Sequence, residues 1–493
     1  MRLSPANLLW GKHARSFLLV IATLALLLTS LGARELWTQE HRWADIVSHM
    51  FQTNDFLHPW LNGQPYYDKP LLSYWLISGT AILTGKLSTW ALRLPSAVAG
   101  IIAIGAIVSL GKQLKNRELG LLAGWMLLTT FYFLFWARTS SADMLNMAGT
   151  LCAVSWYFEK KPVPRFLNYS IFYLIIAFTA LCKGLIAPVV VVLVILPDLL
   201  KNGQWRKHLR PALFLAALPA LILYLLPFWV SAKTGGTHYQ ENGLMLVWRE
   251  NVLRYFQPFD HKGPIYTYFL YLPVYLLPWT LFFIPSLATF RKRLMSTSVL
   301  ILFVFLTLSG SRRDYYILPV VPFALLMSAD WILAEGVRSR RCQLAGWLAL
   351  ISATLFFLFF CILQPLYYKA NSLEAFSIHL KQEAEKTRPW WQWKVVLLDP
   401  QSKLRFYLGL PADTALNEIQ GKDRASLTEA DLRHNWSFLT SEKPVQPTIY
   451  ITREAWKVPL QHLLGSHYRI IENPPCHCRH SSASRPVAFI GDR

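Results

Sequence analysis

The sequence contains few charged residues for its length. Only 16% of the 493 residues are Asp, Glu, Lys or Arg, whereas 54% are hydrophobic. Soluble domains carry about 25% charged residues, so this composition excludes an ordinary soluble globular protein. Apolar runs close to the roughly 20 residues that cross a bilayer recur along most of the chain. The sequence therefore predicts a multispan membrane protein.

Acidic residues are much scarcer than basic ones. The chain has 28 Asp and Glu residues against 49 Lys and Arg residues, which gives a net charge of +21. Such an excess fits nucleic acid binding, but it also fits membrane topology, because short cytoplasmic connections are rich in Lys and Arg. With a cytoplasmic N-terminus, every predicted inner connection is basic: residues 111–118, 158–165, 201–210, 290–294 and 336–342. We therefore assign the charge to topology and expect no nucleic acid partner.

Cysteine is also scarce, and its spacing gives no strong metal motif. Four of the six cysteines lie in or beside apolar runs, where we interpret them as packing residues: Cys152, Cys182, Cys342 and Cys361. The other two belong to the run CHCRH. A lone Cys-x-Cys with two histidines lacks the paired spacing of a structural zinc site. A metal site, a local thiol pair and an ordinary loop all remain open for Cys476 and Cys478.

Eleven segments have the length and hydropathy of membrane spans. They are residues 16–33, 95–111, 119–136, 142–157, 167–181, 184–200, 211–231, 264–288, 297–309, 315–334 and 343–367. No small-residue cleavage site follows the first segment cleanly, so we interpret it as a retained anchor and not as a signal peptide. The predicted fold class is an all-α multispan membrane protein with about 11 transmembrane helices and a small C-terminal α/β domain.

The predicted domains follow from this pattern. Residues 1–367 form a transmembrane domain with two large outer loops, 34–94 and 232–263, and residues 368–493 form a periplasmic domain. Within the first loop, the apolar run 71–84 is too short to span a bilayer. We expect this run to form a helix that lies along the membrane interface.

The tail combines helical patterns with short apolar runs typical of strands. A helix is predicted over AFSIHLKQEAEKT and another at 453–464, and the strand-like runs are KVVLLD, TIYIT, YRII and PVAFIG. These runs predict the α/β domain.

Ionisable side chains gather in the predicted outer loops and at the ends of spans. Charges at membrane depth are costly and indicate functional sites. Carboxylates mixed with several Arg and Lys residues on one face suit an anionic headgroup such as a phosphate, beside a group that must lose a proton. The simpler alternative is that these residues are interface anchors and salt-bridged loop residues.

Several motifs occur in an order that resembles a known family. The first outer loop contains LWTQEHRWADI and NDFLHPWLNGQPYYDKPLLSYW, and RLPSAVAG, ARTSSADML and YYILPVVPFALL follow, so that the series covers about residues 30–330. This series resembles the integral-membrane glycosyltransferases related to protein O-mannosyltransferases. Within them it is most similar to the bacterial branch that includes the lipid A aminoarabinose transferases. Each motif alone is weak, but the combination of Asp-Lys-Pro with Tyr-Trp and of Tyr-x-Leu-Pro is specific.

The resemblance implies both a fold and an activity. The fold is that of the multispan glycosyltransferase C class. The activity is transfer of a sugar from a polyprenyl (undecaprenyl) phosphate carrier, with inversion at the anomeric carbon, in the bacterial inner membrane. The implied acceptor is approached from the periplasm and is lipid A, a lipid-linked glycan or a protein.

The resemblance also implies which carboxylates act. The family's first-loop motif is an acidic pair ahead of Arg and an aromatic residue, and here Gln39-Glu40 precede Arg42-Trp43. Because glutamine cannot accept a proton, Glu40 is the first candidate for the base that activates the acceptor, and Asp143 is the second. The alternative for Asp143 is a helix N-cap, which would satisfy free backbone amides.

Cations are expected to face the leaving phosphate. Lys69 matches the family's Asp/Glu-Lys-Pro motif, and the further candidates are Arg138, Lys183, Arg254, Arg312 and Arg313. Tyr67, Asp68 and Tyr315 belong to the same motifs. Two prolines of the last motif, Pro319 and Pro322, are expected to kink their span and shape a groove for the isoprenoid chain, although kinks occur in many spans.

Asp68 has three interpretations. It pairs with a cation of the site, or it holds a divalent cation together with His261, as the resemblance to some aminoarabinose transferases implies. The third interpretation is a salt bridge that pins the loop to the interfacial helix. Two ligands make a poor closed site, so no cofactor beyond this divalent cation is expected.

Two other functions remain open. Transporters and lipid flippases tend to show half-to-half repeats and ionisable residues near the bilayer midplane. This sequence shows no internal repeat, and its ionisable residues fall in outer loops and at span ends. The second alternative is a catalytically inactive relative that binds a polyprenyl lipid, and Gln39 keeps it open.

Overall fold

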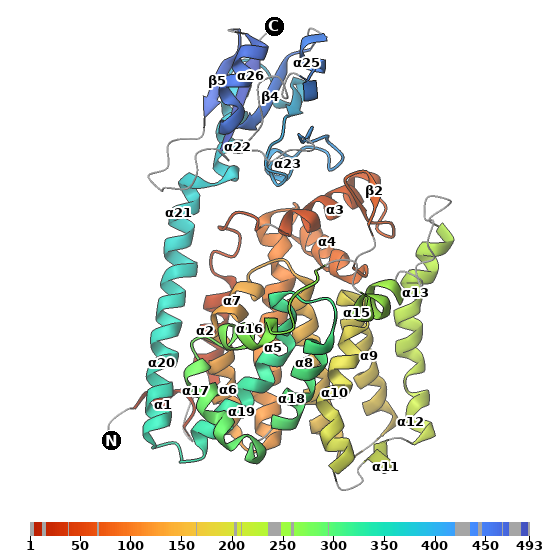
Figure 1. The fold of residues 1–493 in the computed structure, drawn as a ribbon, viewed down its shortest axis with the longest axis vertical. Coiled ribbons are helices and arrows are strands. Elements are labelled where there is room, and N and C mark those ends of the chain that lie inside the picture. Colours follow the sequence, from red (N-terminus) through yellow and green to blue (C-terminus); the bar gives the residue numbers. More distant parts are fainter. Residues whose placement is uncertain are drawn as a thin grey trace. The chain divides into compact units, whose positions relative to one another are not determined.

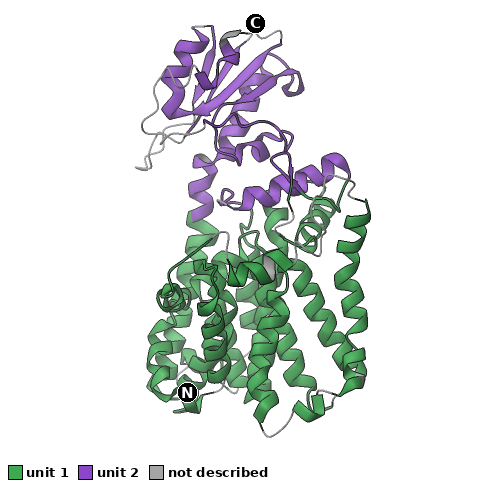
Figure 2. Ribbon diagram, turned by 45° about the vertical axis from the view of Figure 1, so that its right-hand side comes forward, with its two compact units in different colours: residues 1–32, 55–59, 65–363 green, residues 33–54, 60–64, 364–493 purple. Residues whose placement is uncertain are grey.

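The structure is a computed structural model (Figure 1), and it describes the chain in fourteen stretches. They are residues 4–11, 16–37, 39–66, 69–163, 165–201, 205–208, 210–234, 248–257, 261–293, 295–419, 434–441, 446–465, 467–472 and 485–491. The chain divides into two compact units (Figure 2). Unit 1 comprises residues 1–32, 55–59 and 65–363, and unit 2 comprises residues 33–54, 60–64 and 364–493. The tail therefore forms one unit with part of the first predicted outer loop.

Unit 1 consists of helices. Its α-helices are α1 (Pro5–Leu9), α2 (Ser16–Leu28), α4 (Leu72–Thr84), α5 (Thr89–Leu114), α6 (Arg117–Leu128), α7 (Phe131–Ala137), α8 (Ala142–Lys160), α9 (Phe166–Lys183), α10 (Ile186–Leu200), α11 (Trp205–His208), α12 (Pro211–Leu215), α13 (Leu218–Thr234), α15 (Arg254–Phe256), α16 (Thr267–Tyr275), α17 (Thr280–Ser286), α18 (Ser296–Leu308), α19 (Val321–Leu333) and α20 (Arg340–Phe357). Shorter 3-10 and π-helical segments adjoin them: η3 (Arg249–Leu253), η4 (Leu287–Lys292), η5 (Asp314–Val320) and η6 (Leu358–Leu363).

Several of these helices have the length and hydropathy of membrane spans. Among the described residues, five helices qualify, or six if the bent pair α6 and α7 counts as one span. With adjoining helical segments counted as one helix, they are Thr89–Leu114, Phe166–Lys183, Leu213–Thr234, Asp314–Leu333 and Arg340–Glu385. Apolar helices of 10–17 residues also form at Ser16–Leu28, Leu72–Thr84, Ile186–Leu200 and Ser296–Leu308. A mostly helical membrane protein is therefore confirmed.

Two predicted spans are interrupted. The segment predicted at 119–136 bends by 70° between α6 and α7. At this break the hydroxyls of Thr129 and Thr130 donate to the carbonyls of Trp125 and Met126, and such side-chain bonds to the backbone bend helices. The segment predicted at 264–288 separates into α16 and α17, with prolines inside both helices.

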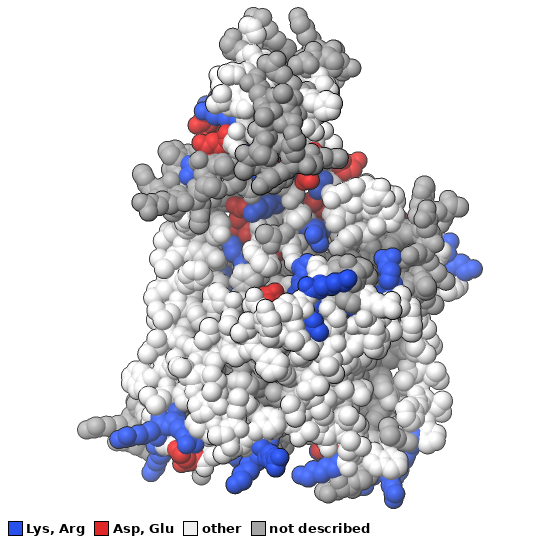
Figure 3. Space-filling view, viewed as in Figure 1, with Lys and Arg blue, Asp and Glu red and all other residues white. Residues whose placement is uncertain are grey.

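Charged side chains occupy the ends of unit 1. On the face drawn in Figure 3, Lys and Arg gather at the end where α1 and α11 lie, and a belt of uncharged residues follows them. Basic residues of this kind include Lys112 near the end of α5 and Lys160 near the end of α8. A charge-free belt beside basic connections is the surface that a bilayer requires.

Helices α5 and α6 pack closely through glycines. A Cβ atom placed on Gly120 would lie 2.3 Å from the carbonyl oxygen of Val108, and one on Gly111 would lie 2.6 Å from the Cα atom of Gly120. Gly120 and Gly124 form a Gly-x-x-x-Gly pattern on α6. Small residues let membrane helices approach until their backbones touch. This contact fixes α5 and α6 relative to each other. Helices α7 and α8 follow α6 in the chain and pack against α5.

We expect Gly120→Ala to lower the free energy of unfolding by about 1–3 kcal/mol, because overpacking forces the two backbones apart. Gly105→Ala is the matched control, since a Cβ atom at Gly105 of α5 meets nothing within 4 Å. The measurement is thermal unfolding of the purified protein in one detergent. Equal stability of the two variants would contradict the packing contact.

Unit 2 contains a mixed four-stranded sheet in the order β3-β4-β6-β5. Its elements are α3 (Glu40–Thr53), β1 (Trp60–Leu61), α21 (Gln364–Asn371), α22 (Leu373–Glu385), β3 (Lys394–Leu397), α23 (Leu404–Leu408), α25 (Phe438–Ser441), β4 (Thr448–Arg453), α26 (Lys457–Leu464), β5 (Arg469–Glu472) and β6 (Pro486–Gly491). Strand β3 pairs parallel with β4, and β6 is antiparallel to both β4 and β5. The four predicted strands and the two predicted helices of the tail are confirmed.

Alternation along the central strands gives the sheet two cores. Ile449 and Ile451 of β4 pack with α22 and α23 on one face. Tyr450, between them, packs with Trp456 and Leu460 on the other face. A strand that is buried on both sides reads as a continuous apolar run, which explains why the pattern was visible in the sequence.

Helix α3 is held in unit 2 by a buried ion pair. The guanidinium of Arg405 donates to the Asp45 carboxylate over 2.7 Å, and both side chains are 4% exposed. Arg405 also donates to Asn62 (3.0 Å) and to the carbonyls of Ala412 and Thr414. Burial raises the pKa of Asp45 from its ordinary value of 3.8 to about 6, although Arg405 lowers it. The folded state therefore binds a proton between pH 4 and pH 6 that the unfolded state releases.

This proton makes stability depend on pH in a defined direction. Because the folded pKa of Asp45 is the higher one, we expect unit 2 to lose stability as pH rises through this window, by about 3 kcal/mol in all. Asp45→Asn should remove this slope, whereas Asp413→Asn, at an exposed carboxylate, should keep it. Thermal unfolding between pH 4.5 and pH 7 checks this. An unchanged slope in Asp45→Asn would contradict the assignment.

Candidate active site

The candidate site begins where two helices of unit 1 meet. Helix α8 is capped by Ser141, whose hydroxyl accepts a hydrogen bond from the backbone amide of Asp143 (3.0 Å). Helix α9 runs back along α8 after a short connection and ends at Lys183. The N-cap is thus Ser141, and Asp143 stands in the first turn with its carboxylate directed to Lys183. The alternative role of Asp143 as the N-cap itself is wrong.

A close helix contact sets the distance between these two ends. A Cβ atom on Gly149 of α8 would lie 2.0 Å from the hydroxyl oxygen of Thr179 on α9. Both residues lie within two turns of Asp143 and Lys183. The glycine therefore lets the helices approach until the two charged side chains touch.

Asp143 and Lys183 form a shielded ion pair. Their side chains are 12% and 13% exposed, and the Lys183 ammonium lies 5.0 Å from the centre of the Tyr316 ring. An acid at a helix N-terminus and a base at a helix C-terminus each interact favourably with the helix dipole. The Ser141 hydroxyl donates to the other carboxylate oxygen of Asp143 (3.0 Å). The carboxylate is therefore fixed in position.

Helix α4 brings a second lysine to the same place. The Ser73 hydroxyl donates to the backbone carbonyl of Cys182 over 2.8 Å, which ties the start of α4 to the end of α9. The Trp75 indole donates to the carbonyl of Phe56 over 2.7 Å. Lys69 precedes α4, so these bonds hold it near Lys183.

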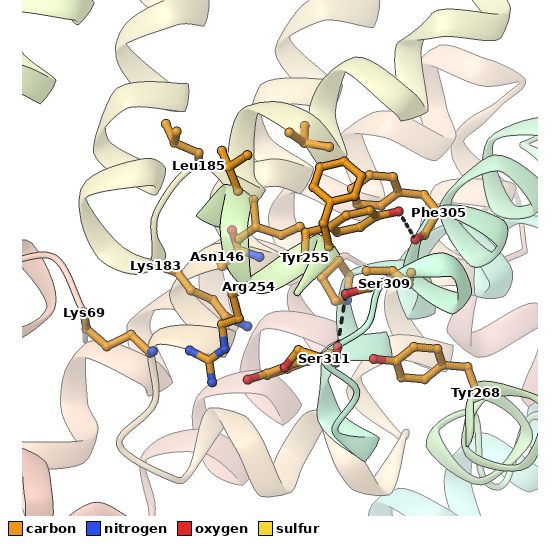
Figure 4. A pocket seen from close by; sticks show the side chains of 17 residues that line it. Lys69, Asn146, Lys183, Leu185, Arg254, Tyr255, Tyr268, Phe305, Ser309 and Ser311 are labelled. Atoms are coloured by element: carbon orange, nitrogen blue, oxygen red, sulfur yellow. Dashed lines mark hydrogen bonds between the residues drawn. The ribbon is translucent and has the colours of Figure 1, made fainter. Parts of the chain in front are cut away.

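A cavity of about 350 Å³ opens beside this cluster. It is lined by Lys69, Asn146, Lys183, Leu185, Ile186, Val189, Val252, Arg254, Tyr255, Phe256, Tyr268, Phe305, Leu306, Ser309, Ser311, Tyr316 and Pro319. Figure 4 shows Lys69, Lys183 and Arg254 reaching one end of it from three different segments. Three cations at one place repel one another, and an anion bound between them relieves that repulsion.

The rest of the cavity wall is largely apolar. Ile186 and Val189 come from α10, Leu306 from α18 and Pro319 from η5. The Tyr255 hydroxyl donates to the carbonyl of Phe305 over 2.9 Å, so its ring closes one side (Figure 4). A hydrocarbon chain fits such a wall, and Pro319 lies where the sequence predicted a groove.

The structure places Arg138 away from this cavity lining. Its guanidinium donates to the carbonyls of Leu26 (2.6 Å) in the last turn of α2 and of Thr29 (2.9 Å) and Ser30 (3.1 Å) after it, and to the carbonyl of Phe360 (3.4 Å). Helix C-termini leave such carbonyls without intrahelical partners. Arg138 therefore holds the end of α2, and the geometry gives no support to its predicted role as a phosphate ligand.

Arg312 and Arg313 follow Ser311 but do not line the cavity. Arg312 donates to the carbonyls of Thr307 (3.1 Å) and Gly263 (2.5 Å). Arg313 donates to the hydroxyl of Tyr315 (3.0 Å) and to the imidazole of His261 (3.0 Å). Both arginines thus brace the connections that precede α16 and η5.

The predicted metal pair gains no support from the described residues. Arginine only donates, so Nδ1 of His261 is the acceptor of the bond from Arg313. Tyr67 and Asp68 lie outside the described residues, as do His238, Cys476 and Cys478. Across the stretches that the structure describes, no group of three or more His, Cys, Asp or Glu side chains gathers as a metal site would require.

Glu40 and Arg42 belong to unit 2. The Glu40 carboxylate accepts hydrogen bonds from the backbone amide of Trp37 (2.7 Å) and from Arg34 (3.4 Å), and Glu40 is fully buried. Arg42 is exposed on α3. The carboxylate thus stabilises the turn that leads into α3.

Most of the lining residues were not singled out from the sequence, and the polar ones among them include Asn146, Ser311 and Tyr316. Tyr316 belongs to the Tyr-x-Leu-Pro motif, and the motif was the available signal. Asn146 is a polar residue inside an apolar run, a pattern that indicates a functional side chain in membrane helices. Ser311 has no such signal.

The chain is similar to known proteins in sequence and in fold. Residues 68–230 match the profile of the family described as dolichyl-phosphate-mannose-protein mannosyltransferase. Over 365 residues the chain is 26% identical to the undecaprenyl phosphate-alpha-4-amino-4-deoxy-L-arabinose arabinosyl transferase of Shewanella sediminis. The matched region covers 69% of this chain and 65% of that protein. The family resemblance predicted from the sequence is confirmed. A protein of the same name from Pectobacterium atrosepticum is 27% identical over 68% of this chain and 63% of its own length. This chain therefore spans slightly less than two thirds of these relatives.

Solved structures show the fold. ArnT from Cupriavidus metallidurans bound to undecaprenyl phosphate superposes with a TM-score of 0.71 and 17% identity, covering 96% of this chain and 97% of that one. The apo oligosaccharyltransferase of Archaeoglobus fulgidus gives a TM-score of 0.51 at 12% identity, covering 92% of this chain and 71% of that one. The chain thus has the glycosyltransferase C fold.

Proposed function

We propose that the chain is a membrane glycosyltransferase that moves a sugar from a polyprenyl phosphate carrier to an acceptor hydroxyl. The observation that carries the proposal is the cavity of unit 1, which has three cations, Lys69, Lys183 and Arg254, at one end and an apolar wall beyond them. A sugar-linked polyprenyl phosphate has the matching parts, an anionic phosphodiester that gains a second negative charge when the sugar leaves, and a branched hydrocarbon chain. Relatives named for undecaprenyl phosphate-linked sugars support the same donor class.

The proposed topology places this cavity on the periplasmic side of a bacterial inner membrane. The N-terminus is then cytoplasmic, the chain crosses the bilayer about 11 times, and residues 368–493 form a periplasmic domain. The basic connections at the opposite end of unit 1 support this orientation (Figure 3). The acceptor approaches from the periplasm and is lipid A, a lipid-linked glycan or a protein.

The reaction in this proposal is one displacement at the anomeric carbon. The acceptor oxygen forms a bond to that carbon while the bond from the carbon to the phosphate oxygen breaks, with inversion. The electron pair of the broken bond stays on the phosphate, where Lys69, Lys183 and Arg254 stabilise the developing charge. The acceptor proton passes to a carboxylate.

Asp143 is the carboxylate that the geometry favours as the base. It contacts Lys183, a residue of the cavity wall, and its side chain is 12% exposed. A bound phosphate competes with Asp143 for the Lys183 ammonium, which leaves the carboxylate able to face the acceptor hydroxyl. Glu40, the first candidate from the sequence, is fully buried and accepts bonds from Trp37 and Arg34. We therefore place Asp143 ahead of Glu40.

The two carboxylates are compared by matched amide substitutions. We expect Asp143→Asn to lower kcat about 10²–10⁴-fold, because an amide cannot take the acceptor proton. Glu40→Gln should retain most activity, since its amide oxygen still accepts the bond from Trp37. The measurement is transfer of radiolabelled sugar from a polyprenyl phosphate donor in purified membranes.

Two results would contradict parts of this proposal. Unchanged transfer by Asp143→Asn would remove the base assignment. Failure of the wild-type protein to consume any donor in a broad panel would remove the activity itself and favour an inactive lipid-binding relative, or a transporter.

The cationic end of the cavity has its own test. Lys69→Gln and Arg254→Gln should each weaken binding of decaprenyl phosphate by about 10–100-fold, because each removes a charge-assisted contact of about 1.5–3 kcal/mol. Arg291→Gln, at an exposed arginine of η4, is the matched control and should bind normally. Binding is measured by titration of the purified protein in nanodiscs. Normal binding by both cavity variants would place the phosphate elsewhere.

A further inference from the structure

Asn146 is a buried polar side chain that has no hydrogen-bond partner among the described residues. Its Nδ2 and Oδ1 atoms are both inaccessible to solvent, and neither bonds to any described residue. The residue is 0% exposed. Buried amide groups in folded proteins are almost always hydrogen-bonded, so an orphaned pair indicates a missing ligand group.

The position of Asn146 connects it to the proposed site. It lies on α8 three residues after Asp143, and such residues share one helix face. It also lines the cavity of unit 1 together with Lys183 and Arg254. Figure 4 shows its amide beside these two cations. The orphaned amide is therefore close to where the phosphate end of a donor would bind.

Ser311 supplies a second orphaned group in the same cavity. Its hydroxyl oxygen is buried and bonds to no residue in the part of the chain that the structure describes, and the residue is 5% exposed. The backbone around it is fixed, because its carbonyl accepts a bond from the Ser309 hydroxyl (3.2 Å) and it pairs with Lys262 in a β-bridge. The hydroxyl is thus held at the cavity wall (Figure 4).

The chemistry of these groups selects among ligands. The amide of Asn146 presents an NH₂ group that only donates and an oxygen that only accepts, and a serine hydroxyl both donates and accepts. A phosphate only accepts and would leave Oδ1 of Asn146 without a partner. An ammonium only donates, would leave Nδ2 without one, and is repelled by Lys69, Lys183 and Arg254. A sugar hydroxyl donates and accepts, so it satisfies both atoms.

We propose that Asn146 and Ser311 form the subsite for the sugar of the donor, and that this sugar is uncharged and hydroxylated. The inference rests on the proposed function and narrows its substrate class. It separates this chain from the relatives named for 4-amino-4-deoxy-L-arabinose, a sugar that carries an amine. Asn146 and Ser311 then bind hydroxyls while the three cations bind the phosphate.

A matched pair of donors tests the sugar class. Decaprenyl phosphate carries either L-arabinose or 4-amino-4-deoxy-L-arabinose, which differ only in a hydroxyl or an amine at carbon 4. We expect purified full-length protein to bind or transfer the hydroxyl form at least tenfold better. A preference for the amine form would overturn the inference and leave the proposed glycosyltransferase activity intact.

Asn146→Leu tests the residue itself, with Thr150→Val as control. Thr150 lies one turn further along α8, and its hydroxyl already bonds to the Asn146 carbonyl. We expect Asn146→Leu to lower kcat/KM for the L-arabinose donor by about 10–100-fold. Its affinity for sugar-free decaprenyl phosphate should stay within twofold of wild type. Thr150→Val should match wild type in both measurements.

Stability provides an independent readout. Because the amide of Asn146 is orphaned without a ligand, Asn146→Leu should raise the Tm of the ligand-free protein. Equal losses of affinity for sugar-linked and sugar-free lipid, or a lower Tm in Asn146→Leu, would overturn the sugar subsite. If the wild-type protein bound neither lipid, the proposed function would fail instead, so the two failures are distinct.

Discussion

The contact between Asp143 and Lys183 is the interaction on which the cavity depends. One carboxylate, fixed by the Ser141 cap, holds the ammonium of the neighbouring helix at the edge of an apolar space. Without that carboxylate, Lys183 would lose its ion pair in a poorly hydrated place beside two other cations, Lys69 and Arg254, which is strongly unfavourable. The ion pair therefore allows three cationic side chains to lie close together at one end of the cavity, where an anion can bind.

The remainder of unit 1 shows how that arrangement is maintained. Glycines 120 and 149 let helix backbones touch, and Ser73 ties α4 to the end of α9. Arg138 satisfies the carbonyls after α2 that a membrane interior would leave without partners. Both amide atoms of Asn146 are among the buried polar atoms that find no hydrogen-bond partner within the described residues, and we assign them to the sugar of the donor.

Much of this arrangement was predictable from local pattern. Short apolar runs typical of strands identified the four strands of unit 2, and Lys69, Lys183 and Arg254 were all expected at a phosphate. Arg138 was assigned to the same group because sequence shows charge but not the carbonyls that a distant segment, Phe360, presents to it. Glu40 was predicted to be the base because it matched the family motif. Its carboxylate instead accepts a bond from the Trp37 amide in a turn that the sequence pattern did not predict. Both outcomes depended on contacts that residue types do not show: contacts with a distant segment for Arg138, and a local turn for Glu40.

The most direct test of the account is a structure of the protein with decaprenyl phosphate bound in a lipid nanodisc. The account predicts phosphate density between the side chains of Lys69, Lys183 and Arg254, with the isoprenoid chain leaving along Val189 and Pro319. Density for the phosphate at another place, with the cavity of unit 1 holding no lipid, would contradict it.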